Sequence, residues 1–357
     1  MKKIVLTGGG SAGHVTPNIA LMPELKKRGY DMLYVGSVSG IERDIVAKTD
    51  VPYEAIDSGK LRRYFDLKNF TDPFRVIHGY AQARKILRKY SPDVVFSKGG
   101  FVSVPVVLAA HALKIPVVLH ESDITPGLAN KICIRFANKI CCNFSEAVEA
   151  LPSGRAFHTG TPIRHELYSG SRQKALEFTG LSGQRNVLLV IGGSLGSVAI
   201  NKAIRANLPS ILRDFDIVHI CGKGNVDVQL KGKYYADGYR QYEFITEQLP
   251  DVFALTSIAI SRAGANAIFE LVSLQIPHIL IPLSKAASRG DQILNARSFE
   301  KHGFSYVLGE EQLLEVDIAE IIRNVYDSRD TYIHAMESSG IHEATTSIAD
   351  IIDGEIS

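Results

Sequence analysis

The chain has 357 residues, of which 45% are hydrophobic and 22% are charged. This composition is typical of a globular protein and excludes an intrinsically disordered chain, and the length fits two domains of about 150 to 200 residues. No signal peptide is predicted, because a short apolar run and then glycines follow Met1-Lys2-Lys3. The most apolar longer stretch, residues 102–120, contains two prolines and a lysine and is a poor membrane span. We therefore expect a cytoplasmic chain.

The charges are divided unevenly along the chain. Residues 1–163 contain 22 Lys and Arg against 14 Asp and Glu, whereas the remainder contains 18 against 24. Most of the basic excess lies in residues 60–90, which hold nine basic and two acidic residues. Aromatic side chains lie among these charges, namely Tyr64, Phe65, Phe70 and Phe74. The pattern suits an anionic membrane surface, and an ordinary solvated helix packed on a sheet is the alternative.

Four cysteines show no C-x-x-C spacing, and two of them are adjacent in an apolar segment. They are Cys133, Cys141, Cys142 and Cys221. We predict buried free thiols, with neither a disulfide framework nor a zinc site.

In the first half, short apolar runs alternate with longer amphipathic segments. Strands are predicted at residues 4–7, 32–37, 53–58, 94–99, 117–121 and 140–144. A helix is predicted at residues 18–29, with Gly29 in the position of a C-terminal cap. Such a β-α-β series indicates a mostly parallel sheet covered by helices on both faces.

The second half restarts the pattern at residues 186–197, NVLLVIGGSLGS, with a strand, a glycine loop and a helix start. Further strands are predicted at residues 215–222, 242–245, 258–264, 277–283 and 306–309. The stretch 151–167, rich in Gly, Pro and small polar residues, is the predicted linker. Two Rossmann-like domains that face each other across a ligand-binding cleft are the simplest account.

The first glycine loop, TGGGSAGHVTP at residues 7–17, can be read as G-x-G-x-x-G. A dinucleotide site also needs a carboxylate at the end of the second strand, but none occurs before Glu42. Glycine-rich turns follow three predicted strands, at residues 8–10, 99–100 and 192–193. Their backbone N–H groups are suited to binding phosphate or pyrophosphate. For any one loop alone, glycines that serve only a tight turn between strand and helix are an equally good explanation. Together they favour a donor and an acceptor that both carry a diphosphate.

Seven motifs, in this order, closely resemble the MurG family of peptidoglycan N-acetylglucosaminyltransferases, in the two-domain GT-B superfamily. They are GGGSAGHVTP, SKGGFVSVP, HESDITPGLANK, GTPIR, GGSLGSVAIN, SRAGANAIFEL and PLSKAASRGDQILNA. The resemblance implies an α/β fold of two Rossmann-like domains. Residues 1–162 would face the acceptor and the membrane, residues 163–340 would bind the UDP-sugar donor, and helix 341–357 would pack back on the first domain.

The resemblance also implies the reaction. N-acetylglucosamine would pass from UDP-N-acetylglucosamine, with inversion, to the C4 hydroxyl of lipid I, undecaprenyl-pyrophosphoryl-N-acetylmuramoyl-pentapeptide, giving lipid II. No metal is expected, consistent with the lack of a D-x-D sequence, and no other cofactor. The enzyme would be peripheral on the cytoplasmic face of the cell membrane, which residues 60–90 would contact. A nucleic-acid partner is not expected, because the basic region lacks a recognition motif and the other half is acidic.

His14 is the first candidate for the general base. It follows the first glycine loop at a predicted helix start, where its titration near neutral pH and the helix dipole suit a base. The segment HESD contains three further candidates. We rank Asp123 above His120 and Glu121 as the residue that contacts the acceptor or relays charge to the base. The alternative is that HESD only makes structural hydrogen bonds at the end of the strand. The expected acceptor and diphosphate contacts are Gly9, Gly10, Ser11, Gly13, Gly99 and Gly100.

By resemblance, the donor contacts lie in the second half. Ser194, amides around Gly193 and the fork of Arg164 would bind the diphosphate. Glu270 would accept hydrogen bonds from the ribose, and the uracil would meet the backbone near Phe244 and Ile245. The transferred sugar would contact Asp291 and Gln292, supported by Asn295. Two residues depart from the family pattern: Leu195 stands where Gln is frequent, and Asp291 where some members have Gln.

Three alternatives stay open. A UDP-N-acetylglucosamine 2-epimerase shares the architecture and donor, but gives no reason for the GGFVSVP loop or the basic segment. A glycolipid synthase would differ in its donor and acceptor. A nucleotide-sugar sensor without turnover would require that His14 be dispensable.

Overall fold

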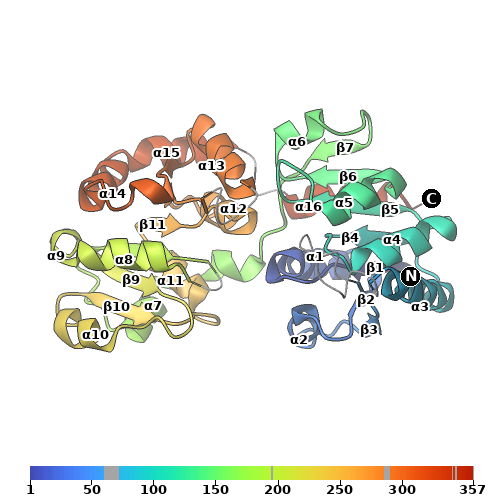
Figure 1. Ribbon diagram of the computed structural model, residues 1–357, viewed down its shortest axis with the longest axis horizontal. Helices are drawn as coiled ribbons and strands as arrows, with labels where there is room; N and C mark the ends of the chain where they lie inside the picture. Colours follow the sequence, from blue (N-terminus) through green and yellow to red (C-terminus); the bar gives the residue numbers. More distant parts are fainter. Residues whose placement is uncertain (60–71, 194–195, 285–289, 340, 342–343, 357) are drawn as a thin grey trace. The chain divides into compact units, whose positions relative to one another are not determined.

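The computed structural model describes residues 1–59, 72–193, 196–284, 290–339, 341 and 344–356. The chain divides into two compact units, one of Met1–Arg164 with His342–Ser357 and the other of His165–Ile341. Each unit is a parallel sheet flanked by helices (Figure 1). Two domains of Rossmann-like type are therefore confirmed.

The N-terminal unit is built on a parallel sheet whose strand order, in the described residues, is β3-β2-β1-β4-β5-β6-β7. Ile4 of β1 lies between Met32 of β2 and Val94 of β4. The strands are β1 (Lys2–Thr7), β2 (Tyr30–Ser37), β3 (Tyr53–Ile56), β4 (Val94–Ser97), β5 (Val117–Glu121), β6 (Lys139–Cys142) and β7 (Ala156–His158). The helices are α1 (Thr16–Lys27), α2 (Ile41–Val46), α3 (Asp72–Tyr90), α4 (Ser103–Ala112), α5 (Leu128–Cys133), α6 (Ser145–Glu149) and the short η1 (Ala12–His14) and η3 (Ile134–Phe136).

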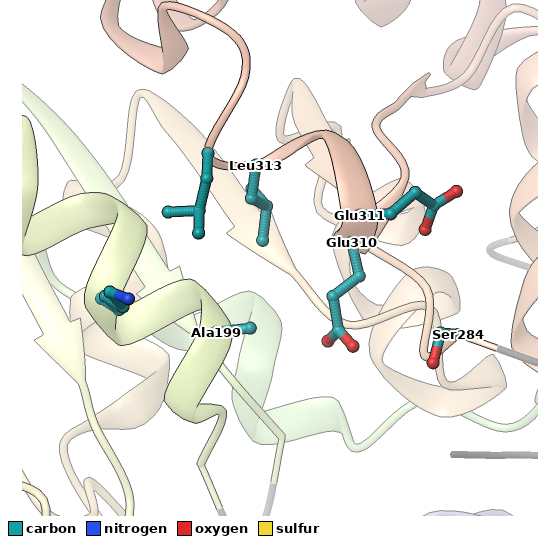
Figure 2. Close-up of a pocket in the computed structure, with 7 residues that line it drawn as sticks. Ala199, Ser284, Glu310, Glu311 and Leu313 are labelled. Carbon is teal, nitrogen blue, oxygen red and sulfur yellow. The ribbon is translucent and has the colours of Figure 1, made fainter. Parts of the chain in front are cut away.

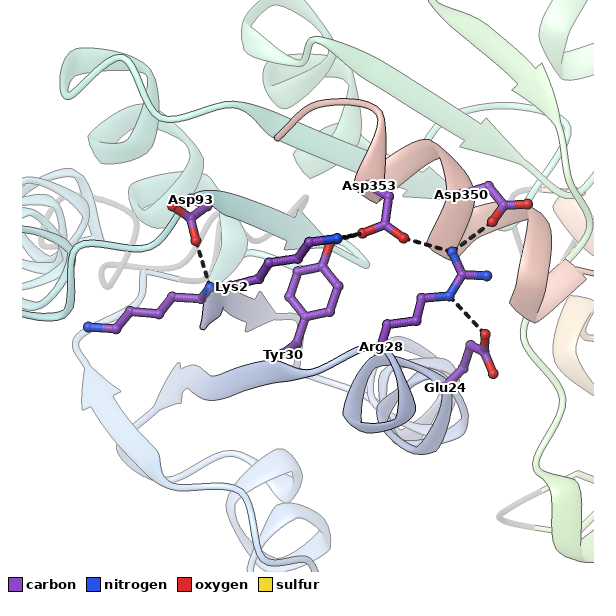
Figure 3. A network of polar contacts seen from close by, with 8 residues as sticks. Lys2, Glu24, Arg28, Tyr30, Asp93, Asp350 and Asp353 are labelled. Atoms are coloured by element: carbon purple, nitrogen blue, oxygen red, sulfur yellow. Dashed lines mark hydrogen bonds and ion pairs between the residues drawn. The ribbon is translucent and has the colours of Figure 1, made fainter. Parts of the chain in front are cut away.

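The last helix, α16 (Ala344–Asp353), belongs to the N-terminal unit although it ends the chain (Figure 1). Ile348, Ala349 and Ile352 are buried in the same core as residues of α1 and β1. A polar network joins α16 to the unit (Figure 3). Asp353 accepts hydrogen bonds from Lys2 Nζ at 2.6 Å, Tyr30 OH at 2.7 Å and Arg28 Nη1 at 2.8 Å. Residues more than 300 positions apart in sequence thus share one core and one charged network.

The second unit has a parallel sheet whose order, again in the described residues, is β10-β9-β8-β11-β12-β13. One apolar core cluster of this unit lies between the sheet and α8, α9 and α14. The strands are β8 (Asn186–Ile191), β9 (Phe215–Ile220), β10 (Tyr239–Tyr242), β11 (Ile258–Ser261), β12 (His278–Leu280) and β13 (Tyr306–Val307). The helices are α7 (Arg172–Thr179), α8 (Val198–Ala206), α9 (Leu208–Ile211), α10 (Val228–Tyr234), α11 (Leu249–Leu255), α12 (Ala265–Ser273), α13 (Asp291–Lys301), α14 (Ile318–Asp327), α15 (Arg329–Glu337) and the short η4 (His165–Ser169) and η5 (Glu310–Gln312).

Two expectations about the bounds of elements are wrong. The predicted linker 151–167 contains the boundary between the two units, after Arg164, but it starts too early, because it includes β7, which pairs with β6 as the edge strand of the N-terminal sheet. The strand predicted at residues 242–245 ends at Tyr242 and begins earlier, at Tyr239. The expectation of buried free thiols is confirmed for all four cysteines, and burial raises the pKa of Cys221 to about 11 and of Cys133 and Cys142 to about 12.

Candidate functional site

The N-terminal sheet reverses its strand order between β1 and β4. From β1 the chain continues to β2 on one side, and from β4 it continues to β5 on the other. Ligands of open parallel sheets bind beyond the carboxyl ends of the strands at such a point. The first two glycine loops, Gly8–Gly10 and Gly99–Gly100, follow these two strands and touch each other. Gly9 N–H donates to the Gly99 carbonyl oxygen at 3.3 Å, and a Cβ at Gly100 would lie only 2.1 Å from the Gly9 carbonyl oxygen.

A fully buried carboxylate, Glu42, closes the first glycine loop from the side of β2. Its Oε2 accepts a hydrogen bond from Gly10 N–H at 3.1 Å, and its Oε1 accepts one from Ser37 N–H at 3.0 Å. A Cβ at Gly9 would lie 2.5 Å from the Glu42 carboxyl carbon. In this structure the amides of Gly9 and Gly10 are therefore bonded within the protein. No role is predicted for Glu42 from the sequence, in which it stands too far along the chain to complete a dinucleotide site.

His14 ends η1 directly before α1, and its side chain is partly exposed. Its Nδ1 shares a hydrogen bond with Ser11 Oγ at 3.0 Å. Gly8 passes close beneath its backbone, since a Cβ at Gly8 would lie 2.4 Å from the His14 carbonyl oxygen. Gly13 is partly exposed and Ser11 exposed. The loop thus presents an oriented imidazole, the group that most often moves protons at neutral pH.

The HESD segment ends β5, beside β4 in the sheet. His120 is fully buried and its Nε2 donates to the Gly160 carbonyl oxygen at 2.9 Å. Burial, together with the charge of Lys98, holds the pKa of His120 well below its usual value, so the ring is neutral. Burial raises the pKa of Glu121, whose carboxylate accepts hydrogen bonds from Asp123 N–H at 3.0 Å and Asn130 Nδ2 at 2.8 Å. Among the three titratable residues of this segment, Asp123 alone is partly exposed.

Lys98 also lies here, between β4 and the second glycine loop, with only 1% of its surface exposed. Its Nζ donates to Ser122 Oγ, in the HESD segment. No role is predicted for Lys98 from the sequence, although it stands inside the motif SKGGFVSVP. The signal that could have found it is a lysine at the end of a fully buried strand, because lysines are almost never fully buried unless paired.

The second sheet reverses its order between β8 and β11. Gly193 follows β8 with a φ of +90°, a conformation that favours glycine, and α8 begins shortly after. Ser194 and Leu195 lie outside the described residues. Ser197 caps α8, because its Oγ accepts a hydrogen bond from Ile200 N–H at 3.3 Å.

Arg262, for which no role is predicted from the sequence, binds three loops at this edge of the sheet. It follows β11 and its guanidinium donates to Ser197 Oγ at 2.6 Å. It also donates to the Ile281 carbonyl oxygen at 3.1 Å, beyond β12, and pairs with Glu310, beyond β13. One planar, nearly buried guanidinium therefore fixes the glycine loop relative to the ends of two other strands. Its place in the motif SRAGANAIFEL was the available signal.

The other predicted donor residues lie mainly at the carboxyl ends of strands in the second unit. Phe244, which is 49% exposed, and the buried Ile245 follow β10. Glu270 lies partly exposed on α12, which follows β11. After β12, the partly exposed Asp291 begins α13, Gln292 Oε1 accepts a hydrogen bond from Leu283 N–H at 3.1 Å, and Asn295 is buried. Arg164 instead closes the first segment of the N-terminal unit.

A pocket of about 350 Å³ opens beside α8 in the second unit (Figure 2). Its walls are Ala199, Lys202, Ser284, Glu310, Glu311, Leu313 and Leu314. None of the described residues predicted to bind the donor lines it. With two carboxylates and one ammonium on its walls, the pocket is a poor match for a diphosphate.

Only part of the basic segment 60–90 can be placed, because residues 60–71 lie outside the described residues. The remainder is α3, whose exposed side chains include Arg75, Lys85, Arg88 and Lys89. Ile77 is 65% exposed on the same helix. Among the helices described, none is both long and apolar enough to span a bilayer.

The chain matches two family domains in order. Residues 4–142 match the N-terminal domain of glycosyltransferase family 28, and residues 187–353 match its C-terminal domain. The chain is 54% identical over 353 residues, 99% of each chain, to the UDP-N-acetylglucosamine–N-acetylmuramyl-(pentapeptide) pyrophosphoryl-undecaprenol N-acetylglucosamine transferase of Lachnoclostridium phytofermentans.

Solved structures share the fold. MurG of Acinetobacter baumannii superimposes with a TM-score of 0.73 at 22% identity, covering 99% of this chain and 100% of that one. A UDP-GlcNAc 2-epimerase of Neisseria meningitidis superimposes with a TM-score of 0.65 at 16% identity, covering 99% of both chains. The epimerase is thus a distant structural neighbour.

Proposed function

The chain belongs to glycosyltransferase family 28, within which it is a MurG-type N-acetylglucosaminyltransferase of peptidoglycan synthesis, and on that premise we propose its substrates and the roles of its residues. It transfers N-acetylglucosamine from UDP-N-acetylglucosamine to the C4 hydroxyl of lipid I, and the products are lipid II and UDP. The observation that carries the proposal is the 54% identity over 99% of a relative named for this reaction. At that identity the two chains share both domains in full.

The donor binds at the strand ends of the second unit. The loop after β8, with Gly193 and Ser194, offers amides to the diphosphate at the start of α8, and Arg164 adds charge. Glu270 accepts hydrogen bonds from the ribose, the uracil meets the backbone at Phe244 and Ile245, and the sugar contacts Asp291 and Gln292. The buried Arg262 supports this loop through Ser197, because its 2.6 Å hydrogen bond fixes the residue that caps α8.

The acceptor binds at the strand ends of the N-terminal unit. His14 takes the proton from the C4 hydroxyl as that oxygen attacks the anomeric carbon, and the bond to the UDP oxygen breaks on the opposite face. One displacement inverts the anomeric centre without a covalent intermediate. Asp123, held at the end of β5, contacts the acceptor or relays charge to the base. Gly9, Gly10, Ser11, Gly13, Gly99 and Gly100 form the surface that receives the acceptor diphosphate.

The amides of this surface are not all available in the structure described. Gly10 N–H donates to Glu42, and Gly9 N–H donates to Gly99. Acceptor contacts through these two glycines therefore require the loop to exchange its internal hydrogen bonds. Gly100 packs closely against Gly9, so a side chain at position 100 would have no room in the loop described here.

The test is transfer by the purified protein without added metal. Wild type and His14→Ala are incubated with UDP-N-acetylglucosamine and a lipid I analogue, and UDP release and the disaccharide product are measured. We expect product from wild type and a loss of about 100-fold or more in His14→Ala. The matched control is His334→Ala, at an exposed histidine of α15, which should keep wild-type rates.

Each alternative has its own outcome. Transfer that survives His14→Ala would assign the base to Asp123 or another residue. Formation of the 2-epimer from UDP-N-acetylglucosamine alone would support the epimerase alternative, and donor binding without UDP release would support a sensor.

The same proposal places the N-terminal unit on the cytoplasmic face of the membrane as a peripheral protein. The lipid tail of the acceptor stays in the bilayer, so the acceptor-binding unit must approach an anionic surface. The exposed basic side chains of α3 and the exposed Ile77 suit that surface.

A further inference from the structure

Lys98 is the most deeply buried cation described in the N-terminal unit, and the proposed reaction gives it no part. It has 1% of its surface exposed and follows β4 at the point where the sheet reverses its strand order. A buried ammonium is costly unless neighbouring groups compensate its charge. The groups that surround the ammonium should therefore show what role the lysine has.

The backbone of Lys98 is fixed by both glycine loops. Lys98 N–H donates to the Thr7 carbonyl oxygen of β1 at 2.9 Å. A Cβ at Gly8 would lie 3.2 Å from the Lys98 Cβ, so the first loop passes directly against it. The next residue, Gly99, accepts hydrogen bonds from Gly9 N–H and, at 2.8 Å, from Ser103 Oγ. The side chain thus starts from a rigid point.

From that point the side chain reaches the HESD segment at the end of β5. Its ammonium donates to Ser122 Oγ. The carboxylates of Glu121 and Asp123, on either side of Ser122, lie close enough to stabilise its charge. Glu121 in turn accepts the hydrogen bonds from Asp123 N–H and from Asn130, whose amide oxygen lies against Gly99. One ammonium therefore links the glycine loops to the segment that carries Asp123.

We infer that Lys98 is a positioning residue for the acceptor half of the reaction: its ammonium holds Ser122 and Asp123 in place beside the two glycine loops. This inference rests on the proposed function, in which Asp123 acts on the acceptor. Without the ammonium, the buried carboxylate of Glu121 loses the positive charge of Lys98, and the turn after β5 loses the hydrogen bond that anchors Ser122.

The charge of Lys98 gives this role a pH dependence. Burial lowers the pKa of Lys98 to about 8, against the opposing effects of Glu121, Asp123 and Cys141. His120 also faces the ammonium but is neutral, and burial raises the pKa of the Cys141 thiol on β6. Because the ammonium is the active form, transfer should fall as the pH rises through about 8.

The experiment compares the pH profile of transfer in wild type, Lys98→Met, Lys98→Arg and Lys131→Met. Methionine keeps the length without the charge, and arginine keeps the charge at every pH tested. Lys131, an exposed lysine on α5, is the matched control. Circular dichroism reports folding, and calorimetry with UDP reports the donor site, which in the proposal lies on the other unit apart from Arg164.

We expect Lys98→Met to bind UDP normally, to lose about 10- to 100-fold in kcat with the lipid I analogue, and to lack the alkaline decline near pH 8. Lys98→Arg should have higher activity than Lys98→Met, because it keeps the positive charge. It should also lack the alkaline decline near pH 8. A folded Lys98→Met with wild-type kcat and pH profile would overturn the inference. So would an unchanged decline near pH 8 in Lys98→Arg, a result that stays decisive even if the methionine variant does not fold. Absence of product from wild type would instead overturn the proposed function.

Discussion

Among single residues, Glu42 shows how a carboxylate can organise a glycine loop. It is fully buried, and its hydrogen bonds to Gly10 N–H and Ser37 N–H join the loop after β1 to the end of β2. In Glu42→Gln an NH₂ group replaces one acceptor oxygen and faces these donors. We expect this variant to lose about 1–3 kcal/mol of unfolding free energy. Transfer should fall about 10- to 100-fold, because the loop carries His14.

Thermal unfolding and transfer kinetics measure both effects. Glu54→Gln, at an exposed glutamate of the neighbouring β3, is the control that makes the same chemical change without burial. UDP affinity should be unchanged in both variants. If Glu42→Gln unfolds and turns over like wild type, the loop does not depend on this carboxylate.

The sequence predicted the candidate site best where residues sit inside recognisable motifs. The two N-terminal glycine loops do come together, because parallel strands end at the same edge of the sheet and β1 and β4 are neighbours. Glu42, Lys98 and Arg262 were missed because their roles depend on burial. A glutamate on a six-residue helix looks like an ordinary surface residue until the fold encloses it. Lys98 and Arg262 do lie inside motifs, but the motifs do not say which groups these side chains contact.

At the scale of elements, α16 is held to the N-terminal unit by charges as well as by its apolar face. Burial alone would raise the pKa of Asp353, but hydrogen bonds from Lys2, Tyr30 and Arg28 outweigh it and lower that pKa to about 2 (Figure 3). The folded pKa is below the unfolded value of about 3.9, so the stabilisation is complete above pH 4 and is lost as the pH falls toward 2. Because the Asp353 side chain is 28% exposed, solvent screens these interactions. We therefore estimate that they contribute about 1–2 kcal/mol to the free energy of unfolding.

Asp353→Asn should therefore be less stable than wild type by about 1–2 kcal/mol at pH 7, and this difference should shrink as the pH is lowered from 4 to 2. Urea titrations followed by circular dichroism at several pH values measure it. Glu149→Gln, at an exposed glutamate on α6, should show no such pH-dependent difference. A gap between wild type and Asp353→Asn that stays constant from pH 7 to pH 2 would argue against the network.

Most strands could be predicted from short apolar runs, because both faces of a parallel sheet are buried. The strand β7 could not, since it is three residues long, lies at an edge and is only partly buried. The bounds of β10 were misjudged because the strand contains the polar residues Arg240 and Gln241. Arg240 is nevertheless buried, with its guanidinium bonded to the Thr179 and Gly180 carbonyl oxygens.

For the whole molecule, the division of charge follows the division of labour that we propose. The N-terminal unit, residues 1–164 with 342–357, has 23 basic and 18 acidic residues, a net charge of +5, and the second unit has 17 and 20, a net charge of −3. The acceptor half thus attracts an anionic bilayer, while the donor half is repelled by it. The net charge of the whole chain, +2, does not reveal this asymmetry.

The triple variant Lys85→Glu, Arg88→Glu and Lys89→Glu tests this division, because it changes only exposed side chains of α3. Each basic residue near an anionic surface contributes about 1 kcal/mol, so three reversals should weaken binding to phosphatidylglycerol vesicles by about 100-fold or more at low salt. Co-sedimentation measures this, with phosphatidylcholine vesicles as the neutral comparison.

The control reverses Lys174, Lys223 and Lys233, three exposed lysines of the second unit, and should bind like wild type. Transfer to a soluble acceptor analogue should be unaffected in both variants, since α3 acts only by bringing the enzyme to its lipid-anchored substrate. Equal vesicle binding by wild type and the α3 variant would show that α3 does not contribute to membrane binding.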